Sequence, residues 1–574
     1  MDQKIISIGL TLKVFFMKKR ILSTPISLLA VFTIVLTSCN FNPSGLDQQP
    51  TLGTENTATP FQPVSPTSVL AIPTDEPVQI FNVSVSASVP QKLVAEIEKV
   101  PNVKMSDENL SNLKFGVVSS DAESESNWIL AVVAPFYTIS DEISLQDLHE
   151  AWNGHADEVF TNGSVWMTEK TKNTLSELWG ESSGARVKTA PEDEILAKTN
   201  ETKGFAIIPF ESINPGWKVL RIGGISPVQK EFDAHAYPLT VHFGWMGNEE
   251  IIRSIRNNED TFISKTNRDP EKFSVVVLTG TTALTRAIAA KMELNGMTYP
   301  AKDIRDWLLN ADITHISNEV SFSDSCPNAD QYQQSLSFCG QPRYAELLQY
   351  VGTDVVELTG NHLADFGKDP LVQTMQQYTD IGMQYYAAGM DITAARQPIF
   401  IEDHGNRFAF IGCNAAGPDS VFATDTQPGV ATCDGEYLVT KIGELKSQGY
   451  LPIVTFQWGE SYQFAPMTWE VKDAHNMIDA GAVIVSGSQS HIPMSMELYS
   501  GSFIHYGLGN LFFDQMDIPV VGTRREFIDR HYFYDGKYLG VELLTALLED
   551  YSKPRPMTET ERIALLSDAF VDSK

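Results

Sequence analysis

Residues 354–362 read DVVELTGNH, and this stretch decides the expected fold of the chain. The run from Val355 to Leu358 is β-branched and apolar, which predicts a buried strand that leads directly into a Gly-Asn-His turn. In α/β proteins, ligands gather beyond the carboxyl ends of strands. An amide oxygen and an imidazole on one tight turn can serve a metal ion or an oxyanion. An ordinary strand-to-helix loop with a capping Asn explains this stretch equally well when it is taken alone.

Two later stretches repeat the pattern. Residues 452–460 read PIVTFQWGE, and residues 483–491 read VIVSGSQSH. Each is an apolar run that predicts a buried strand, and each ends in side chains able to bind a ligand, Gln457 in the first and His491 in the second. Three strands that end in such side chains predict one constructed site.

Further landmarks carry a resemblance to a known family. In chain order they are residues 359–362 (TGNH) with Asp365 and Gly367, 387–389 (AAG), 458–462 (WGESY), 478–482 (IDAGA), 497–499 (ELY), 506–510 (YGLGN) and 513–515 (FDQ). Through these landmarks, roughly residues 272 to 520 resemble the CapA family of capsule or poly-γ-glutamate synthesis proteins. The resemblance implies a calcineurin-like metallophosphatase fold, which is an α/β sandwich.

The chain departs from the family pattern at three ligand positions. The family usually opens with a strand ending in Gly-Asp, whereas residues 275–280 (VVVLTG) are followed by Thr281. The family's His before Trp-Gly is Gln457, and one His of its Gly-x-His-Pro-His is Gln489. Thr and Gln are neutral, weaker donors, so we expect a much reduced affinity for Mn, Fe or Zn.

The resemblance also implies roles for individual residues. One weakly held divalent ion, or none, is expected, with the ligands Glu319, Asn361 and His491. His362 is the candidate general acid or transition-state stabiliser, and Asp365 and Asp514 are candidates to orient the histidines. The side chains expected to contact a sugar, a peptide or a carboxylate are Thr281, Arg286, Gln457, Trp458, Gln489 and Asn510. Whether the chain is an enzyme is left open by these replacements.

Composition sets outer limits on structure and function. The chain has 574 residues, of which 43% are hydrophobic and 10% aromatic, so it can bury more than one core, and global disorder is excluded. The net charge of −30 argues against nucleic acid as a partner, because phosphate contacts require clusters of Lys and Arg.

The beginning of the chain predicts export. A basic triplet at 18–20 precedes the apolar run 26–36, and the following residues end at Cys39. This pattern indicates a signal peptide over residues 1–39, and its Leu-x-Ser-Cys ending resembles a bacterial lipobox with Cys39 as the lipidated residue. A plain signal anchor is the alternative, and either Met1 or Met17 is the start. The expected location is the outer face of the cytoplasmic membrane or the cell surface.

Three further segments are expected after the signal peptide. Residues 40–78 are rich in Pro, Thr and Ser and predict a disordered tether. Residues 79–268 predict a smaller α/β domain with a strand at 128–136 and a helix capped by Ser144. This domain weakly resembles periplasmic substrate-binding proteins of the phosphate type, on Leu145, Leu148, Trp152, Gly154 and residues 237–239 (YPL). An accessory domain without a ligand is the alternative.

Residues 272–574 are expected to hold the CapA-like domain and a C-terminal extension. A hairpin is predicted around Gly405 and Asn406, which suit a tight turn. After Asp514, a polar loop is expected to lead into a strand at 538–548 and a final helix at 558–570.

Four cysteines remain besides Cys39. Cys326 and Cys339 flank one predicted loop, and Cys413 and Cys433 flank another. Two short-range disulfides are therefore expected in an exported chain, with free buried thiols as the alternative. The chain has no Cys-x-x-Cys spacing, which argues against a zinc site of that kind.

The preferred hypothesis is a lipid-anchored, extracytoplasmic CapA-like protein in capsule or poly-γ-glutamate-type surface-polymer biosynthesis, which binds or assembles rather than hydrolyses. One alternative is an active metal-dependent hydrolase or transferase that acts on a phosphate ester or amide. Another is a solute receptor that uses residues 79–268. The expected partners are the surface polymer or its precursors, other capsule-biosynthesis membrane proteins, and the membrane through the lipid anchor.

Overall fold

The computed structural model describes residues 79–155 and 163–571. The expected signal peptide, Cys39 and the tether at 40–78 lie outside the described residues. None of the helices in the described ranges is both long and apolar enough to cross a membrane.

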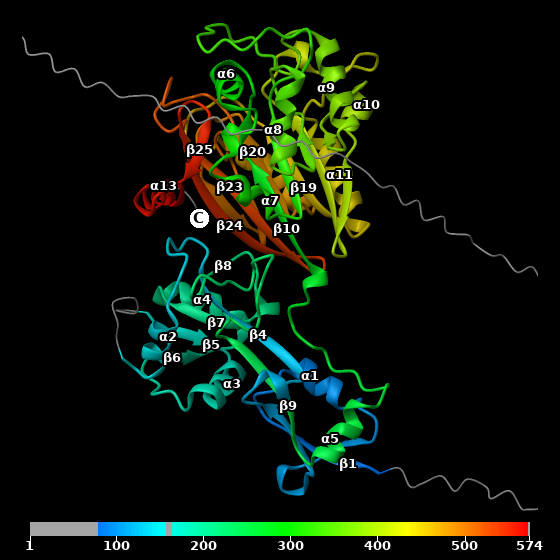
Figure 1. Cartoon of the computed structure of the whole chain (residues 1–574), viewed down its shortest axis with the longest axis vertical. Helices are drawn as coiled ribbons and strands as arrows, with labels where there is room; N and C mark the ends of the chain where they lie inside the picture. Colours follow the sequence, from blue (N-terminus) through cyan, green and yellow to red (C-terminus); the bar gives the residue numbers. More distant parts are fainter. Residues whose placement is uncertain (1–78, 156–162, 572–574) are drawn as a thin grey trace, which may run out of the picture. The chain divides into compact units, whose positions relative to one another are not determined.

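The first sheet belongs to the region between residues 79 and 268 (Figure 1). Its strands are β1 (Phe81–Val85), β2 (Val103–Met105), β3 (Leu113–Val117), β4 (Ser126–Pro135), β5 (Val165–Met167), β6 (Val187–Thr189), β7 (Phe205–Pro209), β8 (Trp217–Val219) and β9 (Thr240–Gly247). Its helices are α1 (Gln91–Ile97), α2 (Leu145–Trp152), α3 (Glu169–Trp179), α4 (Glu192–Thr202) and α5 (Glu249–Arg256). The strand order is β2-β1-β3-β9-β4-β7-β5-β6, with β8 paired to β4.

Local sequence explains two of these elements. The strand expected at 128–136 is β4, whose central residues are buried on both faces of the sheet. The expected helix cap is also present, since Ser144 Oγ accepts a hydrogen bond from the Asp147 backbone N–H at 3.0 Å. The Asp147 carboxylate accepts one from the Ser144 N–H at 3.3 Å, which completes a reciprocal capping box.

Two further large sheets and one small sheet follow. The first has the strands β10 (Phe273–Thr279), β11 (Thr281–Thr282), β12 (Ile313–Asn318), β13 (Val355–Glu357), β14 (Gln384–Tyr386), β23 (Arg525–Tyr534), β24 (Lys537–Glu549) and β25 (Lys553–Pro556). The second has β16 (Ile399–Asp403), β17 (Asn406–Asn414), β19 (Leu451–Gln457), β20 (Ile484–Ser488), β21 (Met496–Tyr499) and β22 (Ser502–His505). Their orders are β14-β13-β12-β10-β23-β24-β25, with β11 paired to β12, and β16-β17-β19-β20-β22-β21. The small sheet pairs β15 (Ala388–Gly389) with β18 (Gly429–Val430).

Helices are interleaved with these strands, as an α/β protein requires (Figure 1). They are α6 (Arg286–Asn295), α7 (Arg305–Leu309), α8 (Ala345–Tyr350), α9 (Lys368–Asp380), α10 (Ile392–Ala395), α11 (Gly435–Ser447), α12 (Thr468–Ala480) and α13 (Glu559–Val571). The α/β class is therefore confirmed, and so is the final helix.

The two further large sheets share one apolar core. Val276 and Val355, from the sheet that contains β10, belong to the same buried cluster as Phe408, Ile453 and Ile484, from the sheet that contains β19. The central strands pair in parallel, and every residue of β10, β12 and β19 is buried, as expected for strands covered on both faces. β10 and β19 are largely apolar, whereas β12 also buries Thr314, His315, Ser317 and Asn318. Two sheets that face each other across one core form the expected α/β sandwich.

One strand contradicts the expectation for this region. Residues 525–534, expected to lie within a polar loop, form β23, which pairs antiparallel with both β10 and β24. The stretch looks polar because it carries several charged residues, yet Glu526 and Asp529 are both buried. The expected hairpin is present, with Asp403 opposite Asn406 at its turn.

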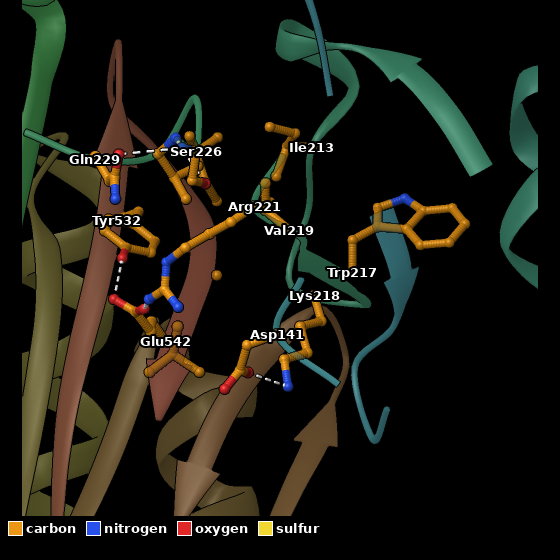
Figure 2. A pocket seen from close by; sticks show the side chains of 14 residues that line it. Asp141, Ile213, Trp217, Lys218, Val219, Arg221, Ser226, Gln229, Tyr532 and Glu542 are labelled. Carbon is orange, nitrogen blue, oxygen red and sulfur yellow. Dashed lines mark hydrogen bonds and ion pairs between the residues drawn. The ribbon is translucent and has the colours of Figure 1, made fainter. Parts of the chain in front are cut away.

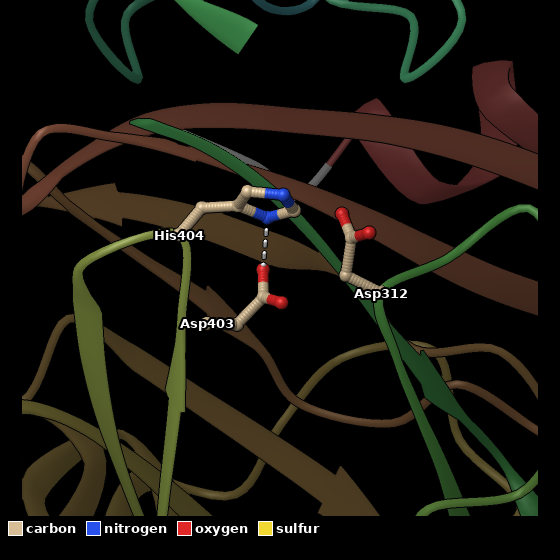
Figure 3. A group of neighbouring side chains, drawn as sticks. All are labelled: Asp312, Asp403 and His404. Carbon is tan, nitrogen blue, oxygen red and sulfur yellow. Dashed lines mark hydrogen bonds and ion pairs between the residues drawn. The ribbon is translucent and has the colours of Figure 1, made fainter. Parts of the chain in front are cut away.

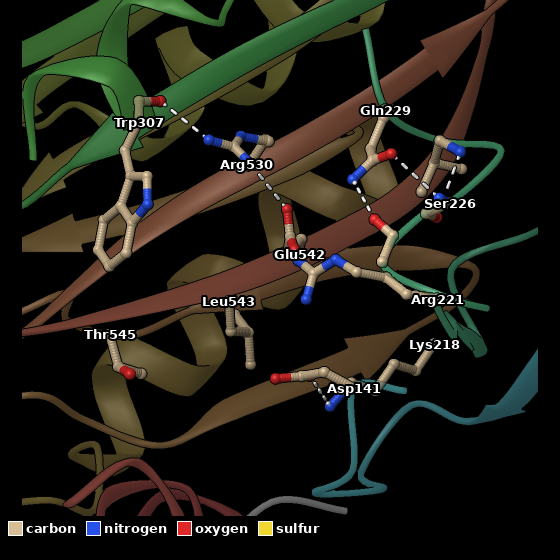
Figure 4. Close-up of polar contacts among 12 residues, drawn as sticks. Asp141, Lys218, Arg221, Ser226, Gln229, Trp307, Arg530, Glu542, Leu543 and Thr545 are labelled. Atoms are coloured by element: carbon tan, nitrogen blue, oxygen red, sulfur yellow. Dashed lines mark hydrogen bonds and ion pairs between the residues drawn. The ribbon is translucent and has the colours of Figure 1, made fainter. Parts of the chain in front are cut away.

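Contacts run across the expected boundary between residues 268 and 272. Glu542 on β24 accepts hydrogen bonds from Arg221 and from Arg530 at 2.9 Å (Figure 4). It also accepts one from the Tyr532 hydroxyl at 2.8 Å. Beside this cluster, Asp141 contacts Lys218 in a small, largely apolar pocket (Figure 2). These charged side chains are already paired with one another, which indicates that they have a structural role at this pocket. The division into domains at this point stays a prediction.

A buried histidine between the sheets makes the stability of the protein sensitive to acid. His315 stacks on Phe410 and its Nε2 lies 2.9 Å from the Tyr386 hydroxyl. Burial lowers the pKa of His315 to about 3, whereas it titrates near 6.5 in an unfolded chain. The unfolded state therefore takes up the proton first, and the contribution of this residue to stability is lost as the pH falls from about 6.5 towards 3.

The His315→Phe variant is accordingly expected to be less sensitive to acid. Urea unfolding followed by circular dichroism should show that the loss of unfolding free energy between pH 7 and pH 4 is smaller than in the wild type by on the order of 3 kcal/mol. Tyr386 keeps its hydrogen bond to Thr455 at 2.7 Å, so its hydroxyl is not left without a partner. An equal pH dependence in both proteins would contradict the assignment.

Candidate functional site

The structure brings the ends of several strands together. The Gln489 backbone N–H donates to Thr281 Oγ1 at 3.3 Å, which connects the end of β20 to β11. The Gln457 amide, at the end of β19, donates to Asn361 Oδ1 at 2.8 Å and to Gln489 Oε1. Hydrogen bonds therefore link four polar residues expected at the site and cross from one sheet to the other. These residues are Thr281, Gln489, Gln457 and Asn361.

A cavity of about 490 Å³ lies beside these four residues. Six of the residues expected from the sequence line it, namely Arg286, Glu319, His362, Gln489, His491 and Asp514. Further lining residues come from the loop between Cys326 and Cys339, whose residues the sequence did not single out, and from the landmark 458–462. They are Gln331, Gln333, Gln334, Leu336 and Phe338 in the loop, and Glu460 and Tyr462 in the landmark. The volume suits a small ligand or the end of a longer one.

His362 lies between two carboxylates. Its Nδ1 is 2.7 Å from Asp365 Oδ2, and its Nε2 is 3.7 Å from Glu319 Oε1. Burial alone would lower the pKa of His362, but the hydrogen bond to Asp365 and the charge of Glu319 outweigh burial, and the pKa is raised. The imidazole is thereby favoured in its protonated form, as a hydrogen-bond donor or general acid requires.

Glu319 forms part of the cavity wall and is 2% exposed. Neither of its carboxylate oxygens has a hydrogen-bond partner among the described residues. Such a group is costly to bury unless a cation or a donor compensates it. Gly360 packs directly against the Glu319 backbone, and a Cβ on Gly360 would lie 2.5 Å from the Glu319 carbonyl oxygen. This close approach sets the position of the Asn361–His362 turn.

His491 is held by Asn510 behind the cavity. Its Nδ1 lies 2.9 Å from Asn510 Oδ1, and the Asn510 amide donates to the His491 carbonyl at 3.2 Å. Asn510 is fully buried and also donates to Gln515 and to the Thr523 carbonyl. It was expected to contact the substrate, but the structure places it where it orients His491.

Two more expectations are corrected by the geometry. Trp458 was expected to contact a ligand, but it is 1% exposed and stacks between Phe456 and Tyr506 in the apolar core. Asp514 was expected to orient a histidine, but it instead binds the Arg286 guanidinium through both oxygens. Asp514 still lines the cavity, whereas Trp458 does not.

Several residues around the cavity have an unusual backbone conformation. Four of them have positive φ although they are not glycine: Arg286 (49°), Tyr462 (50°), Gln489 (78°) and His491 (55°). This left-handed conformation is uncommon for such residues and concentrates where a protein positions side chains for function. No composition or spacing signal in the sequence indicates it.

Both expected disulfides are present, between Cys326 and Cys339 and between Cys413 and Cys433. They indicate an extracytoplasmic location. The loop closed by the first disulfide supplies one wall of the cavity. Its Phe338 packs on the His362 ring with centroids 4.3 Å apart, and the Phe338 N–H donates to Asp365 at 2.7 Å. Cysteine spacing predicted the loop but not the surface that it covers.

A group that could hold a metal ion lies elsewhere. Among the described residues, Asp312, Asp403 and His404 form the one group of three or more Asp, Glu, His or Cys side chains whose ligand atoms lie within 4.8 Å of one another (Figure 3). Asp312 is already paired with Lys230 at 2.6 Å, and His404 with Asp403 at 2.8 Å. The expected ligands Glu319 and His491 are not part of such a group.

The region that contains the cavity is similar in sequence to known proteins. Residues 275–515 match the family model for "Bacterial capsule synthesis protein PGA_cap". The chain is 24% identical over 277 residues to "Capsule biosynthesis protein CapA" of Bacillus anthracis, covering 47% of this chain and 64% of that protein. It is 26% identical over 202 residues to "PGA biosynthesis protein CapA" of Bacillus subtilis (strain 168), covering 35% and 52%. The chain thus spans less than two-thirds of the length of each of these relatives.

Solved structures give more distant similarities. A 5'-nucleotidase precursor from Thermus thermophilus is 16% identical with a TM-score of 0.30, covering 51% of this chain and 58% of that one. An ABC-type phosphate transport receptor from Vibrio cholerae is 13% identical with a TM-score of 0.26, covering 31% and 94%. The similarity to capsule-synthesis proteins rests on the sequence matches.

Proposed function

We propose that this chain, whose residues 275–515 match the capsule-synthesis family model, serves capsule or poly-γ-glutamate-type surface-polymer biosynthesis by binding or assembly rather than by metal-dependent hydrolysis. The cavity beside His362 is the proposed ligand site. Cys39 would anchor the protein by a lipid, so that the cavity works outside the cytoplasmic membrane, next to the membrane proteins of the pathway. The ligand would be the surface polymer, one of its precursors or a pathway partner.

The observation that carries the proposal is the amide chain at the strand ends. Gln457 donates to the side-chain oxygens of Asn361 and Gln489, so these oxygens accept protein hydrogen bonds instead of facing a cation. A two-metal hydrolase needs carboxylate and imidazole ligands to lower the pKa of a bound water. Neutral amides that are already paired do not supply that function, but their remaining donor and acceptor sites can bind a polar ligand.

Metal analysis and turnover assays test the proposal. Purified protein is expected to hold well under one equivalent of Mn, Fe or Zn, and to release no product from a γ-glutamyl amide or a phosphodiester beyond the level of the His362→Ala variant. The reason is that the neutral ligands Thr281, Gln457 and Gln489 replace a carboxylate and two imidazoles. Tightly bound stoichiometric metal together with turnover that depends on His362 would establish the hydrolase alternative instead.

A further inference from the structure

The charges around the cavity do not balance. Its lining includes the three carboxylates of Glu319, Glu460 and Asp514 but only one arginine, Arg286, and no lysine among the described residues. Arg286 is committed to Asp514, which binds its guanidinium through both oxygens. The positive charge of Arg286 is therefore already neutralised within the protein.

The remaining groups leave an excess of negative charge. His362 is shared between Asp365 and Glu319, so one imidazole serves two carboxylates. Glu319 receives no hydrogen bond from the described residues, although it is almost completely buried. At the exposed mouth, Glu460 is bonded to the neutral hydroxyl of Tyr462. A cavity with this balance repels anionic groups and attracts cationic ones.

Aromatic rings on the wall also suit an organic cation. Phe338 and Phe513 already hold the Arg286 guanidinium over their faces, at 4.5 and 5.5 Å from the ring centroids. The Tyr462 ring lines the same cavity and stacks on His491. Ring faces combined with uncompensated carboxylates are the features by which proteins recognise ammonium groups.

A metal ion is a poorer match to the same groups. The carboxylate of Glu319 is not joined by two further Asp, Glu, His or Cys ligands from the described residues within 4.8 Å. The amide oxygens of Asn361 and Gln489 are already bonded to Gln457. Divalent ions need several such ligands around one point, whereas an ammonium group needs only charge and a few acceptors.

We propose that the cavity receives the primary ammonium group of an amine-bearing ligand, such as the free amino end of a precursor or acceptor, between Glu460 at the mouth and Glu319 at the floor. The inference rests on the binding role proposed above for the same cavity. It assigns the anionic part of any surface polymer to a position outside the cavity, because a chain with a carboxylate on every unit would be repelled by Glu319 and Glu460.

Three five-carbon probes of equal length test the inference: cadaverine with two ammonium groups, 1,5-pentanediol with none, and glutarate with two carboxylates. Isothermal titration of the full chain at about 20 mM salt, where charges are weakly screened, should rank cadaverine first and glutarate last. Cadaverine is expected to bind about tenfold more tightly than 1,5-pentanediol, which corresponds to one well-placed charge interaction.

Glutamate variants test which carboxylates bind the ammonium group of cadaverine. Glu319→Gln is expected to weaken cadaverine binding about tenfold, and Glu460→Gln several-fold, while neither should weaken 1,5-pentanediol binding. Glu460 is exposed, so the Glu460→Gln variant retains the test if Glu319→Gln disturbs folding. Glu346→Gln is the matched control, because Glu346 is exposed on α8 and does not line the cavity.

The outcomes separate the inference from the proposed function. Glutarate binding as tight as cadaverine binding, no detectable cadaverine binding, or no effect of either glutamate variant would overturn the amine assignment and leave the binding role to be judged by the metal and turnover assays. Displacement of cadaverine by equimolar Mn²⁺, together with turnover that depends on His362, would overturn both. Cadaverine binding that needs both glutamates, without metal or turnover, supports both.

Discussion

The Gly360→Ala variant is expected to lose about 3 kcal/mol of unfolding free energy and the shape of the cavity with it. A Cβ at this position would lie 2.5 Å from the Cα and the carbonyl oxygen of Glu319, and 2.7 Å from its carbonyl carbon. These are backbone atoms that directly follow β12, so no side-chain rotation can relieve the clash. The turn that carries Asn361 and His362 must move away from Glu319 instead.

Urea unfolding followed by circular dichroism measures this loss, and cadaverine titration reports the cavity. Gly435→Ala provides the matched control, because a Cβ at Gly435, the first residue of α11, meets no atom within 4 Å. Alanine is a better helix former than glycine, so the control should keep or slightly raise stability. If Gly360→Ala proves as stable as the control, the tight approach of the turn to Glu319 is not as described.

The paired substitution Cys326→Ser with Cys339→Ser is expected to cost about 3 kcal/mol of unfolding free energy and to weaken ligand binding. The bond closes a loop whose ends are 13 residues apart, and removing it restores conformational freedom to the unfolded chain. In the folded state, the same loop supplies Phe338, which packs on His362 and donates its N–H to Asp365. A loosened loop leaves that wall of the cavity less well defined.

The second disulfide offers a control of similar strength. Cys413 and Cys433 are 20 residues apart, so Cys413→Ser with Cys433→Ser should reduce stability by a comparable amount. Neither cysteine lines the cavity, and cadaverine affinity should stay at the wild-type value at temperatures where the variant is folded. Equal losses of affinity in both paired variants would show that the first loop has no special role at the cavity.

Much of the architecture follows from local patterns in the chain. Apolar runs ending in polar side chains predicted β13, β19 and β20, since parallel strands covered on both faces tend to carry near-continuous apolar runs. Cysteine spacing predicted both disulfides, and Ser144 predicted the start of α2. The strand β23 was missed because burial of a charged residue depends on neighbours distant in the sequence.

The candidate site was also predicted only in part from the sequence. The family resemblance pointed to Glu319, His362, Gln457, Gln489 and His491 as site residues. The structure brings these five around or next to one cavity. The same reasoning placed Trp458 and Asn510 at the ligand, whereas the first packs in the core and the second holds His491. A strand end presents alternate side chains to opposite sides, and sequence alone does not say which side faces the cavity.

The amino-acid sequence alone indicates the α/β class, the strand ends that could carry a site, and the neutral side chains of Thr281, Gln457 and Gln489 at those ends. Which of the charged side chains are paired follows from the tertiary structure. Arg286 is neutralised by Asp514 while Glu319 is left without a hydrogen-bond partner among the described residues, and the disulfide loop closes one side of the cavity. Electrostatic interactions depend on distance and burial in space, and neither quantity is encoded in the separation of residues along the chain.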